Sequence, residues 1–575
     1  MNGLYNSVDT IWVLLGAALV FFMQPGFAMV ETGLTRAKNA GNIVMKNVMD
    51  FALGTLIFWI FGFGLMFGTD IGGIIGTPDF FILNWNVEPG TGYPAMAYII
   101  FQTVFCATAA TIVSGAMAER TKFSTYCIYS ILISLVIYPV SGHWVWGGGW
   151  LAQMGFHDFA GSTAVHMVGG ICALVGAKFL GARIGKYNED GTVNAIPGHS
   201  LTLAALGVFI LWFAWFGFNG CSTVSMTGDD TLVSAATIFV TTNMAAAAAT
   251  TTVMVLTWIR YGKPDVSMTL NGSLAGLVAI TAGCDVVSVP GAFAIGVIAG
   301  TTVLFAVEFI DQTLKIDDPV GAVAVHGVCG AFGTILTGLF AVKDGLLYTG
   351  NASFFLTQVL GVVSVIAYVG IAITIVFAVL KATIGLRVMA KEEISGLDFE
   401  EHGLASAYAD FMPVPELPGT TSAPAPVGTA VAPAAAVAVE TEGTLAKVPA
   451  QKSAHDISCV SIVTSRERFE SLKLALEAIG ITGMTVTQVL GYGIQKGHTE
   501  LYRSAAVASR LLPKLQIDIV VSAIPPERII EVAKKVLHTG RYGDGKIFVS
   551  TVDNVVKIRT GEEGFDALQD KPMEE

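Results

Sequence analysis

The sequence predicts an all-α membrane domain followed by a soluble α/β domain, because the two parts of the chain differ in hydropathy and charge. Of the 575 residues, 53% are hydrophobic and only 13% are charged, and the mean hydropathy is +0.65, as is typical of a chain that lies largely in a bilayer. Only 15 of the 32 Lys and Arg fall in residues 1–391, and 17 fall in the shorter remainder. The net charge of −12 and the absence of a basic stripe argue against nucleic-acid binding.

The first part of the chain contains eleven apolar segments, each long enough to cross about 30 Å of hydrocarbon at ~1.5 Å per residue. Pro290 leaves the division of residues 269–310 open. The segments lie near residues 11–30, 47–68, 96–117, 125–142, 161–182, 200–219, 231–258, 269–287, 290–310, 320–341 and 353–381.

The basic residues of this part predict its orientation. On one side of the expected membrane, the loops contain a single basic residue, Lys343; these loops include residues 69–95 and 143–160. The other basic residues fall in the alternate loops or at their edges. Because Lys and Arg favour cytoplasmic loops, we expect the N-terminus outside and residues after 382 inside, which requires an odd number of spans. No basic region precedes the first apolar run, so a cleaved signal peptide is not expected. The basic residues used are Arg36, Lys38, Lys46, Arg120, Lys122, Arg183, Lys186, Arg260, Lys263, Lys315, Lys381 and Arg387.

Two stretches repeat one plan, an Asp followed by seven residues and then a His that ends an Ala-Val-His tripeptide. They are Asp158 to His166, at the fifth span, and Asp318 to His326, at the tenth. Ionisable groups at membrane depth mark pathways for ions or protons. Since the two spans run in opposite directions, the pattern predicts a five-plus-five inverted repeat. The alternative is a coincidence between two Gly/Ala-rich spans, and either Asp can simply cap its helix, which is the favoured role for Asp318.

The rest of the chain divides by composition. The boundaries predict a membrane domain over 1–391, a polar cytoplasmic tail over 392–412, a Pro/Ala-rich flexible linker over 413–455 and a soluble domain over 456–575. About 40 residues of coil reach about 35 Å.

The soluble domain alternates strand and helix patterns in the order βαββαβ, which predicts a split-βαβ, ferredoxin-like fold. A polar excursion, 493–512, interrupts the central strand pair, and loops of this length are usually functional or disordered. The expected strands are 457–464, 483–493, 517–523 and 546–552, and the expected helices are 467–479 and 526–538.

Neither part of the chain predicts an enzyme. The seven Cys lie mostly in apolar runs without C-x-x-C spacing, so they indicate neither a disulfide framework nor a metal site. No pair of nucleophile and base emerges from the sequence either.

Several motifs of the first part resemble the Amt/Mep/Rh family of ammonium transporters. The residues Gly396-Leu397-Asp398 and Glu401-His402-Gly403 also look like the regulatory tail of that family. The matching motifs are Glu31-Thr32-Gly33, Gly115-Ala116-Met117-Ala118-Glu119-Arg120, His143-Trp144-Val145-Trp146-Gly147-Gly148-Gly149, Asp158-Phe159-Ala160-Gly161, Trp215-Phe216-Gly217-Phe218-Asn219 and His326-Gly327-Val328-Cys329-Gly330.

This resemblance implies a homotrimer in the inner (cytoplasmic) membrane with one pore per subunit. An indole face attracts a cation and a hydroxyl accepts an N–H bond, which suits an outer recruitment site. Neutral ammonia can cross the apolar segment more cheaply than ammonium, and two imidazoles can carry the proton. Without the motifs, Phe and Trp in spans are usually lipid-facing or interfacial. The implied site residues are Trp146, Ser222 and Phe101 for recruitment, Phe105 and Phe218 for a gate, His166 and His326 for the pore, and Asp158 behind the outer site.

Residues 457–568 resemble a PII nitrogen-signalling protein. The matching runs are Gly480 to Thr487, Gln495 to Arg503 and Gly543 to Val549. The resemblance implies ATP or ADP bound between subunits of a trimer, with 2-oxoglutarate held through Mg²⁺. Glycines that let backbone N–H groups approach phosphates, with a Lys to supply charge, suit this role. The implied residues are Gly483, Met484, Thr485, Gly543, Asp544, Gly545, Lys546 and Arg559 for the nucleotide, Gln495 and Lys514 for Mg²⁺ and 2-oxoglutarate, and Tyr502 and Arg503 for a regulatory loop.

Three positions depart from the PII pattern. Ile494 stands where a basic residue is usual, Lys557 stands where an Arg is usual, and Val507 stands at the modifiable Tyr position. Uridylylation is therefore not expected there, and the preference between ATP and ADP is left open.

The two resemblances together predict an ammonium transporter regulated by its own PII domain, with Arg503 plugging the pore in cis. The alternative is an ammonium sensor that signals to the PII domain with little transport. Intact His166 and His326 favour transport, because a sensor needs only the outer site.

Overall fold

The structure, a computed structural model, describes residues 5–83, 92–404, 407–408, 457–465, 468–491, 499–502, 505–508, 512–540 and 544–568. It consists of two compact units, Met1–Ala407 and Tyr408–Glu575, and each is described here by itself.

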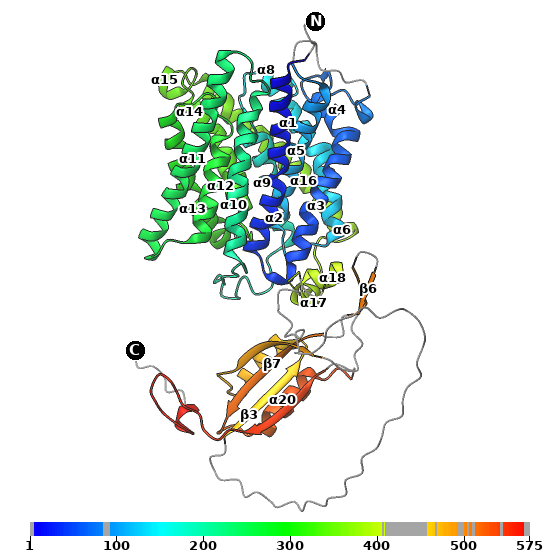
Figure 1. The fold of residues 1–575 in the computed structure, drawn as a ribbon, viewed down its shortest axis with the longest axis vertical. Coiled ribbons are helices and arrows are strands. Elements are labelled where there is room, and N and C mark those ends of the chain that lie inside the picture. Colours follow the sequence, from blue (N-terminus) through cyan, green and yellow to red (C-terminus); the bar gives the residue numbers. More distant parts are fainter. Residues whose placement is uncertain are drawn as a thin grey trace, which may run out of the picture. The chain divides into compact units, whose positions relative to one another are not determined.

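The first unit is a bundle of long helices that run alongside one another (Figure 1), which confirms the predicted all-α membrane class. Among the residues described, ten helical segments are long and apolar enough to cross a membrane, and α12 is a shorter apolar helix. The helices are α1 (Ser7–Phe21), α2 (Met23–Leu34), α3 (Ala40–Ile57), α4 (Phe63–Phe67), α5 (Ala95–Ala116), α6 (Phe123–Leu132), α7 (Tyr138–Val145), α8 (Trp150–Gln153), α9 (Val168–Leu180), α10 (Leu201–Trp215), α11 (Asp229–Tyr261), α12 (Val266–Ile280), α13 (Val289–Glu308), α14 (Cys329–Phe340), α15 (Leu346–Thr349), α16 (Ser353–Thr383), α17 (Ala390–Ser395) and α18 (Leu397–His402). A short pair of strands, β1 (Asp70–Ile71) and β2 (Ile75–Gly76), follows α4.

Several spans contain a π-helical turn, a rare conformation that is frequent at functional sites. Three of these turns carry predicted pore residues, namely His166 in η5, Phe218 in η6 and His326 in η9. The turns are η2 (Phe58–Gly62), η4 (Ile133–Ile137), η5 (Ser162–Met167), η6 (Phe216–Gly220), η8 (Phe309–Thr313) and η9 (Val323–Val328).

Two boundaries refine the expected spans. Residues 269–310 divide into two helices, since α12 ends at Ile280 and α13 begins at Val289 with Pro290 in its first turn, where a missing N–H costs nothing. The second span begins earlier than expected, at Ala40. It therefore encloses Lys46, which the sequence placed at the edge of a loop.

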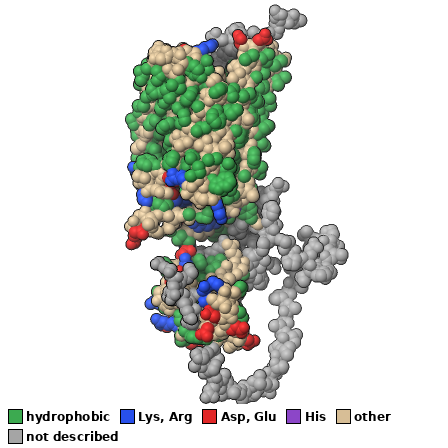
Figure 2. Space-filling model, turned by 90° about the vertical axis from the view of Figure 1, so that its left-hand side faces the viewer, with side chains coloured by type: hydrophobic (Ala, Val, Ile, Leu, Met, Phe, Trp, Pro, Cys, Tyr) green, Lys and Arg blue, Asp and Glu red, His purple; other side chains and the backbone are tan. Residues whose placement is uncertain are grey.

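The surface of this unit suits a lipid environment. Figure 2 shows hydrophobic side chains over most of its visible face, with Lys and Arg gathered toward one end. Large apolar side chains are strongly exposed, for example Phe209 at 70%, Ile259 at 75% and Ile371 at 65%. Such a belt would be costly in water and is expected in lipid.

The two short helices after the last span return to the start of the second span. The carboxylate of Asp398, in α18, accepts hydrogen bonds from the backbone N–H groups of Gly41 and Asn42 (3.0 and 2.7 Å). These groups belong to the first turn of α3, so Asp398 caps that helix from a distant segment. His402 Nε2 lies 2.9 Å from the Asn42 side-chain amide.

The second unit contains an antiparallel sheet of strand order β4-β7-β3-β8. The element order βαββαβ is confirmed, and the two helices α19 and α20 pack against one another and bury Leu472, Leu476, Ile529 and Ala533 with the sheet residues. The polar excursion contains one pairing that the sequence did not predict, a hairpin of β5 with β6. The elements are β3 (Ser458–Thr464), α19 (Phe469–Glu477), β4 (Thr485–Gly491), β5 (Thr499–Tyr502), β6 (Ala505–Ala508), β7 (Leu512–Val521), α20 (Pro526–Leu537) and β8 (Lys546–Thr551).

Candidate functional site

Two broken helices cross within the first unit. A π-turn precedes each helix, η5 before α9 and η9 before α14, and the segments contact each other around Gly170 and Gly327. A Cβ at Gly170 would overlap the backbone nitrogen and Cα of Gly327. Only glycine allows this approach, and small residues commonly let membrane helices pack so closely.

This approach brings the two predicted histidines together. The Nδ1 atoms of His166 and His326 lie 3.3 Å apart, and the rings stack with centroids 5.2 Å apart. His166 is completely buried and His326 is 4% exposed. Among the described residues, His166 Nε2 has no hydrogen-bond partner. One nitrogen of each imidazole is therefore engaged with its neighbour, which is the geometry that a proton transfer between two rings requires.

Both aspartates of the repeat cap their broken helices. The Asp158 carboxylate accepts hydrogen bonds of 2.8–3.0 Å from the backbone N–H groups of Gly161, Ser162, Thr163 and Ala164. Asp318 accepts those of Val320, Gly321 and Val323 in the same way. Burial raises the pKa of both carboxyl groups, and these donors oppose the rise. The capping role predicted for Asp318 is confirmed, and it holds equally for Asp158.

Aromatic rings continue from the histidine pair in a column. Phe218 lies 5.2 Å from His166 and 4.3 Å from Phe105, measured between ring centroids. Phe105 in turn lies 4.8 Å from Phe101 and 6.2 Å from Trp146. Phe101, Phe105 and Phe218 are at most 2% exposed. Rings packed in this way leave no room for a hydrated ion without movement.

Hydrogen bonds fix the far end of this ring column. The Trp146 indole N–H donates to the backbone oxygen of Asp158 at 2.7 Å, so the Asp158 residue holds both the π-turn and the indole. The Ser222 hydroxyl donates to the backbone oxygen of Phe218 at 2.7 Å. All eight predicted residues of the first unit thus belong to one group of packed or hydrogen-bonded segments.

Two members of the ring column, Trp215 and Phe27, are not among the residues predicted from the sequence. Trp215 stacks on His166 at 4.9 Å and donates its indole N–H to the Thr281 hydroxyl at 2.9 Å. Phe27 lies 5.8 Å from His326. Trp215 is the first residue of the motif that contains Phe218, so the motif could have identified it. Nothing in the sequence marks Phe27.

An ionic cluster that the sequence did not predict joins four loops at the helix ends. Arg183 bonds to Asp317 at 2.8 Å and to Glu119 at 3.1 Å, and Glu119 also pairs with Arg36. Burial would raise the pKa of Asp317, but the hydrogen bonds from Arg183 and the charges of Arg120 and Arg183 hold it at about 2. The cluster fixes these loops and does not touch the ring column.

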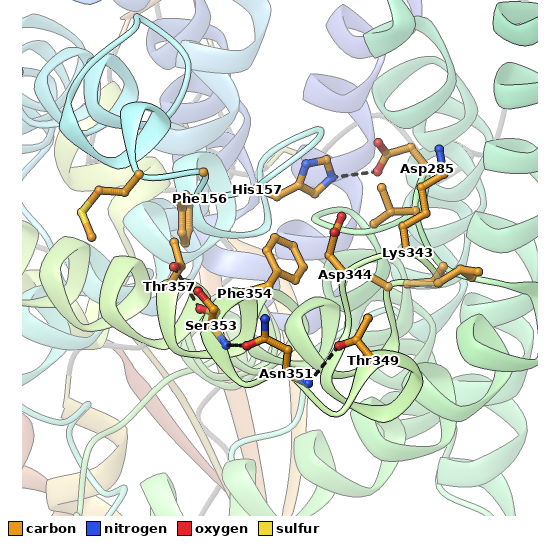
Figure 3. A pocket seen from close by; sticks show the side chains of 16 residues that line it. Phe156, His157, Asp285, Lys343, Asp344, Thr349, Asn351, Ser353, Phe354 and Thr357 are labelled. Carbon is orange, nitrogen blue, oxygen red and sulfur yellow. Dashed lines mark hydrogen bonds and ion pairs between the residues drawn. The ribbon is translucent and has the colours of Figure 1, made fainter.

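A wider cavity of about 820 Å³ lies outside the ring column and is lined by residues from the loop before η5, from α15 and from the start of α16 (Figure 3). In it, the His157 ring points at Asp285, with Nε2 3.0 Å from the carboxylate. Burial would lower the pKa of His157, but the hydrogen bond and charge of Asp285 more than offset it, so the pKa lies above its ordinary value.

The predicted nucleotide residues of the second unit fall on its exposed edges. Gly483 is exposed just before β4, and Thr485 is exposed as the first residue of that strand. Lys546 is exposed at the start of β8, and Arg559 is exposed in a turn. Lys514 is half-buried in β7 and pairs in register with Val489 of β4. Met484 packs partly against the core. Gln495, Ile494, Gly543 and Arg503 lie outside the described residues, as do the side chains of Tyr502 and Val507.

The end of the Gly-Asp-Gly-Lys run forms a fixed turn. Asp544 accepts the backbone N–H and the hydroxyl of Thr539, which lowers the pKa of its carboxyl group. Gly545 has a φ of +119°, and a Cβ there would collide with the backbone of Val463. Asp544 therefore closes the turn, while Lys546 remains exposed and suits a phosphate. Among the described residues, no group of three or more His, Cys, Asp or Glu could hold a metal ion.

Comparison with known proteins agrees with both halves. Residues 11–408 match the Ammonium Transporter Family, and residues 457–562 match nitrogen regulatory protein P-II. Ammonium transporter Amt2 of Archaeoglobus fulgidus is 46% identical over 427 residues, which is 70% of this chain and 89% of that protein. A putative ammonium transporter of Synechocystis, sll1017, is 42% identical over 69% of this chain and 88% of its own length.

Solved structures show the same fold for the first unit. A structure titled Sensor Amt Protein is 40% identical, with a TM-score of 0.65, over 69% of this chain and 98% of that one. Saccharomyces cerevisiae Mep2 is 28% identical, with a TM-score of 0.62, over 68% and 89%. Both families consist of transport and signalling proteins rather than enzymes. The chain is therefore a multi-pass membrane protein of the ammonium transporter family that carries a C-terminal PII domain.

Proposed function

We propose that this protein moves ammonium across the membrane as ammonia and a proton that travel separately past His166 and His326. The observation that carries this proposal is the column in which Phe105, Phe218, His166 and His326 follow one another at ring distances of 4.3–5.2 Å. Removing the water shell of an ammonium ion in so apolar a column costs several kcal/mol, whereas ammonia carries no charge.

At the outer end, Trp146 and Ser222 receive ammonium. The indole face attracts the cation and the hydroxyl accepts one of its N–H groups. Asp158 supports this site from behind, because its side chain is occupied by four backbone donors and its carbonyl holds the indole. Phe101 and Phe105 close the site toward the ring column.

Once ammonium has lost its proton, ammonia passes the gate of Phe105 and Phe218. The proton moves to one imidazole and then across the 3.3 Å between the two Nδ1 atoms. No other described side chain in the column can both accept and donate a proton.

The double variant His166→Ala with His326→Ala tests this mechanism. Ammonium-driven current of the full chain in proteoliposomes should disappear, or ion selectivity should be lost. Wild-type current with wild-type selectivity in the double variant would falsify the relay.

For the PII domain, the proposal is binding of ATP or ADP with Mg²⁺-dependent 2-oxoglutarate. The exposed cations Lys546 and Arg559 support a phosphate site, and Gln495 and Lys514 would hold the metal and the carboxylate. Calorimetry on residues 450–575 tests it, and no heat with ATP or ADP at millimolar concentration refutes nucleotide binding. Because Ile494 carries no charge, ADP is expected to bind at least as well as ATP.

The assembly we propose is a homotrimer in the inner membrane, with the N-terminus outside and the PII domain in the cytoplasm. Arg503 of the long loop would plug the pore in cis, because a guanidinium stays charged and carries five donors. A tether of about 40 residues raises the effective concentration of the loop at the pore to the order of millimolar.

The plug is tested by ammonium current under ADP. The current through the full chain should differ from the current through Arg503→Ala and from the current through a truncation after about residue 412. Equal currents under every ligand contradict the plug.

A second candidate is an ammonium sensor, favoured by the 40% identity to a structure titled Sensor Amt Protein. A sensor would bind ammonium at Trp146 and change the PII domain with little flux. Ammonium uptake by proteoliposomes separates the two, since a sensor would respond to ammonium without filling the vesicles.

A further inference from the structure

A small cavity lies next to the histidine pair and is shared by His326 and Glu31. Its volume is about 20 Å³, which is room for one water-sized molecule. Except for Asn271 and these two residues, its walls are apolar. His326 Nδ1 is engaged with His166, so Nε2 is the ring nitrogen left to exchange a proton with this cavity.

Glu31 is a buried acid in α2. It is 3% exposed, and one carboxylate oxygen accepts a hydrogen bond from the Asn47 side chain at 3.2 Å. The charged groups that act on it are Asp50 and Lys46, both in α3 and both completely buried.

The charges of this group do not balance. Asp50 is satisfied by the Tyr126 and Ser130 hydroxyls. Among the described residues, Lys46 Nζ has no hydrogen-bond partner and lies 5.2 Å from the centre of the Tyr126 ring. Glu401 and Arg120 also act on Lys46, one charge of each sign, so within this group one ammonium still faces the two carboxylates of Glu31 and Asp50. A buried charge without compensation is costly. Glu31, the acid that borders the cavity, is the one that can relieve this imbalance by taking up a proton.

We infer that Glu31 is a further proton-relay residue of the pore, beyond His326. This inference rests on the proposed function. The proton of the His326 imidazolium passes to the Glu31 carboxylate, directly or through one water, which leaves a neutral imidazole and a carboxylic acid. The Glu31 O–H then breaks as ammonia leaving the pore takes the proton, which forms ammonium and restores the carboxylate. Ionisable residues inside membrane bundles are typical members of such relays.

The test compares three variants of the full chain in proteoliposomes by ammonium-driven current and ammonium uptake. Glu31→Gln keeps the size of the side chain and an acceptor for Asn47 but cannot carry a proton. Its steady current should fall on the order of 100-fold, the lower range for a positioned acid–base group. Glu31→Asp keeps the carboxyl group and should retain at least about a tenth of the current.

Thr32→Val is the matched control. Thr32 is the next residue of the same helix, equally buried, and does not border the cavity. It should conduct like the wild type, and elution and thermal unfolding in detergent should match the wild type for all three variants.

The outcomes separate the inference from the proposed function. A wild-type protein without current or uptake refutes the proposed transport, whatever Glu31 does. A conducting wild type with equal current in Glu31→Gln overturns the relay through Glu31 alone. Equal losses in Glu31→Asp and Glu31→Gln, or a comparable loss in Thr32→Val, also overturn it, because only a structural role would then remain.

Discussion

Trp146 combines two roles that a single substitution can separate. Its indole N–H fixes the Asp158 backbone, and its ring faces Phe105. Trp146→Leu removes both, and a half-buried cation–π contact contributes about 1 kcal/mol, so the ammonium concentration for half-maximal current should rise about fivefold. Selectivity should stay as in the wild type, since the histidine pair is untouched. Trp146→Phe keeps a ring without the donor and should lie between the two; a shift equal to that of Leu would contradict the role of the ring face.

His157 makes stability depend on pH at the wider cavity. Its pKa in the folded protein is raised above the ordinary value of 6.5 by Asp285. The stabilising pair is therefore fully present below pH 6.5 and is lost as the pH rises through the folded pKa. Thermal unfolding of the solubilised full chain should show a loss of at most about 1 kcal/mol across this window. Asp285→Asn should flatten the dependence, and an unchanged slope in that variant would assign the effect to another group.

At the scale of helices, the crossing at Gly170 and Gly327 holds the relay together. In Gly170→Ala the new methyl group overlaps the backbone of Gly327, which cannot shift without disturbing the helix crossing. We therefore expect the free energy of unfolding to fall by about 1–3 kcal/mol and the two imidazoles to move apart. Unfolding temperature and ammonium current should fall together. Gly370→Ala, in α16, is the control, because the nearest atom to its Cβ is 4.0 Å away. Wild-type current in Gly170→Ala would show that the close crossing is not needed.

At the scale of the whole molecule, each unit has its own core. The described core of the sheet unit includes Val460, Ile462, Ile517 and Ile519 and is formed by residues of that unit. The full chain should therefore unfold in two transitions by circular dichroism. Residues 450–575 alone should reproduce one of them within about 4 °C, the shift expected from about 1 kcal/mol. Ile517→Ala should lower the free energy of unfolding of the sheet unit by about 2–5 kcal/mol and leave the other transition unchanged. A single common transition would mean that the units fold as one.

The sequence alone determined the two classes of unit and the approximate positions of the spans, and its motifs named most of the rings of the column, but not Trp215 or Phe27. Hydropathy suffices for the spans, because a helix in lipid must be apolar over its own length whatever its neighbours are. The alternation of strand and helix patterns sufficed for β3, α19, β4, β7, α20 and β8, although β7 begins at Leu512 and not at the expected residue 517. It failed for the β5/β6 hairpin, because Ala505 to Ala508 has little strand propensity.

Only the tertiary structure decided which groups meet. His166 and His326 are 160 positions apart, and no local pattern predicts the close helix crossing that joins them. The π-turns, the stacking of Trp215 on His166 and the cavity between Glu31 and His326 likewise depend on packing between distant segments. Lys46 shows the same limit, since its charge suggested a loop edge and the helix buries it completely. The burial and the role of a single charged residue in an apolar run depend on its partners, which come from other helices and cannot be identified from the local sequence.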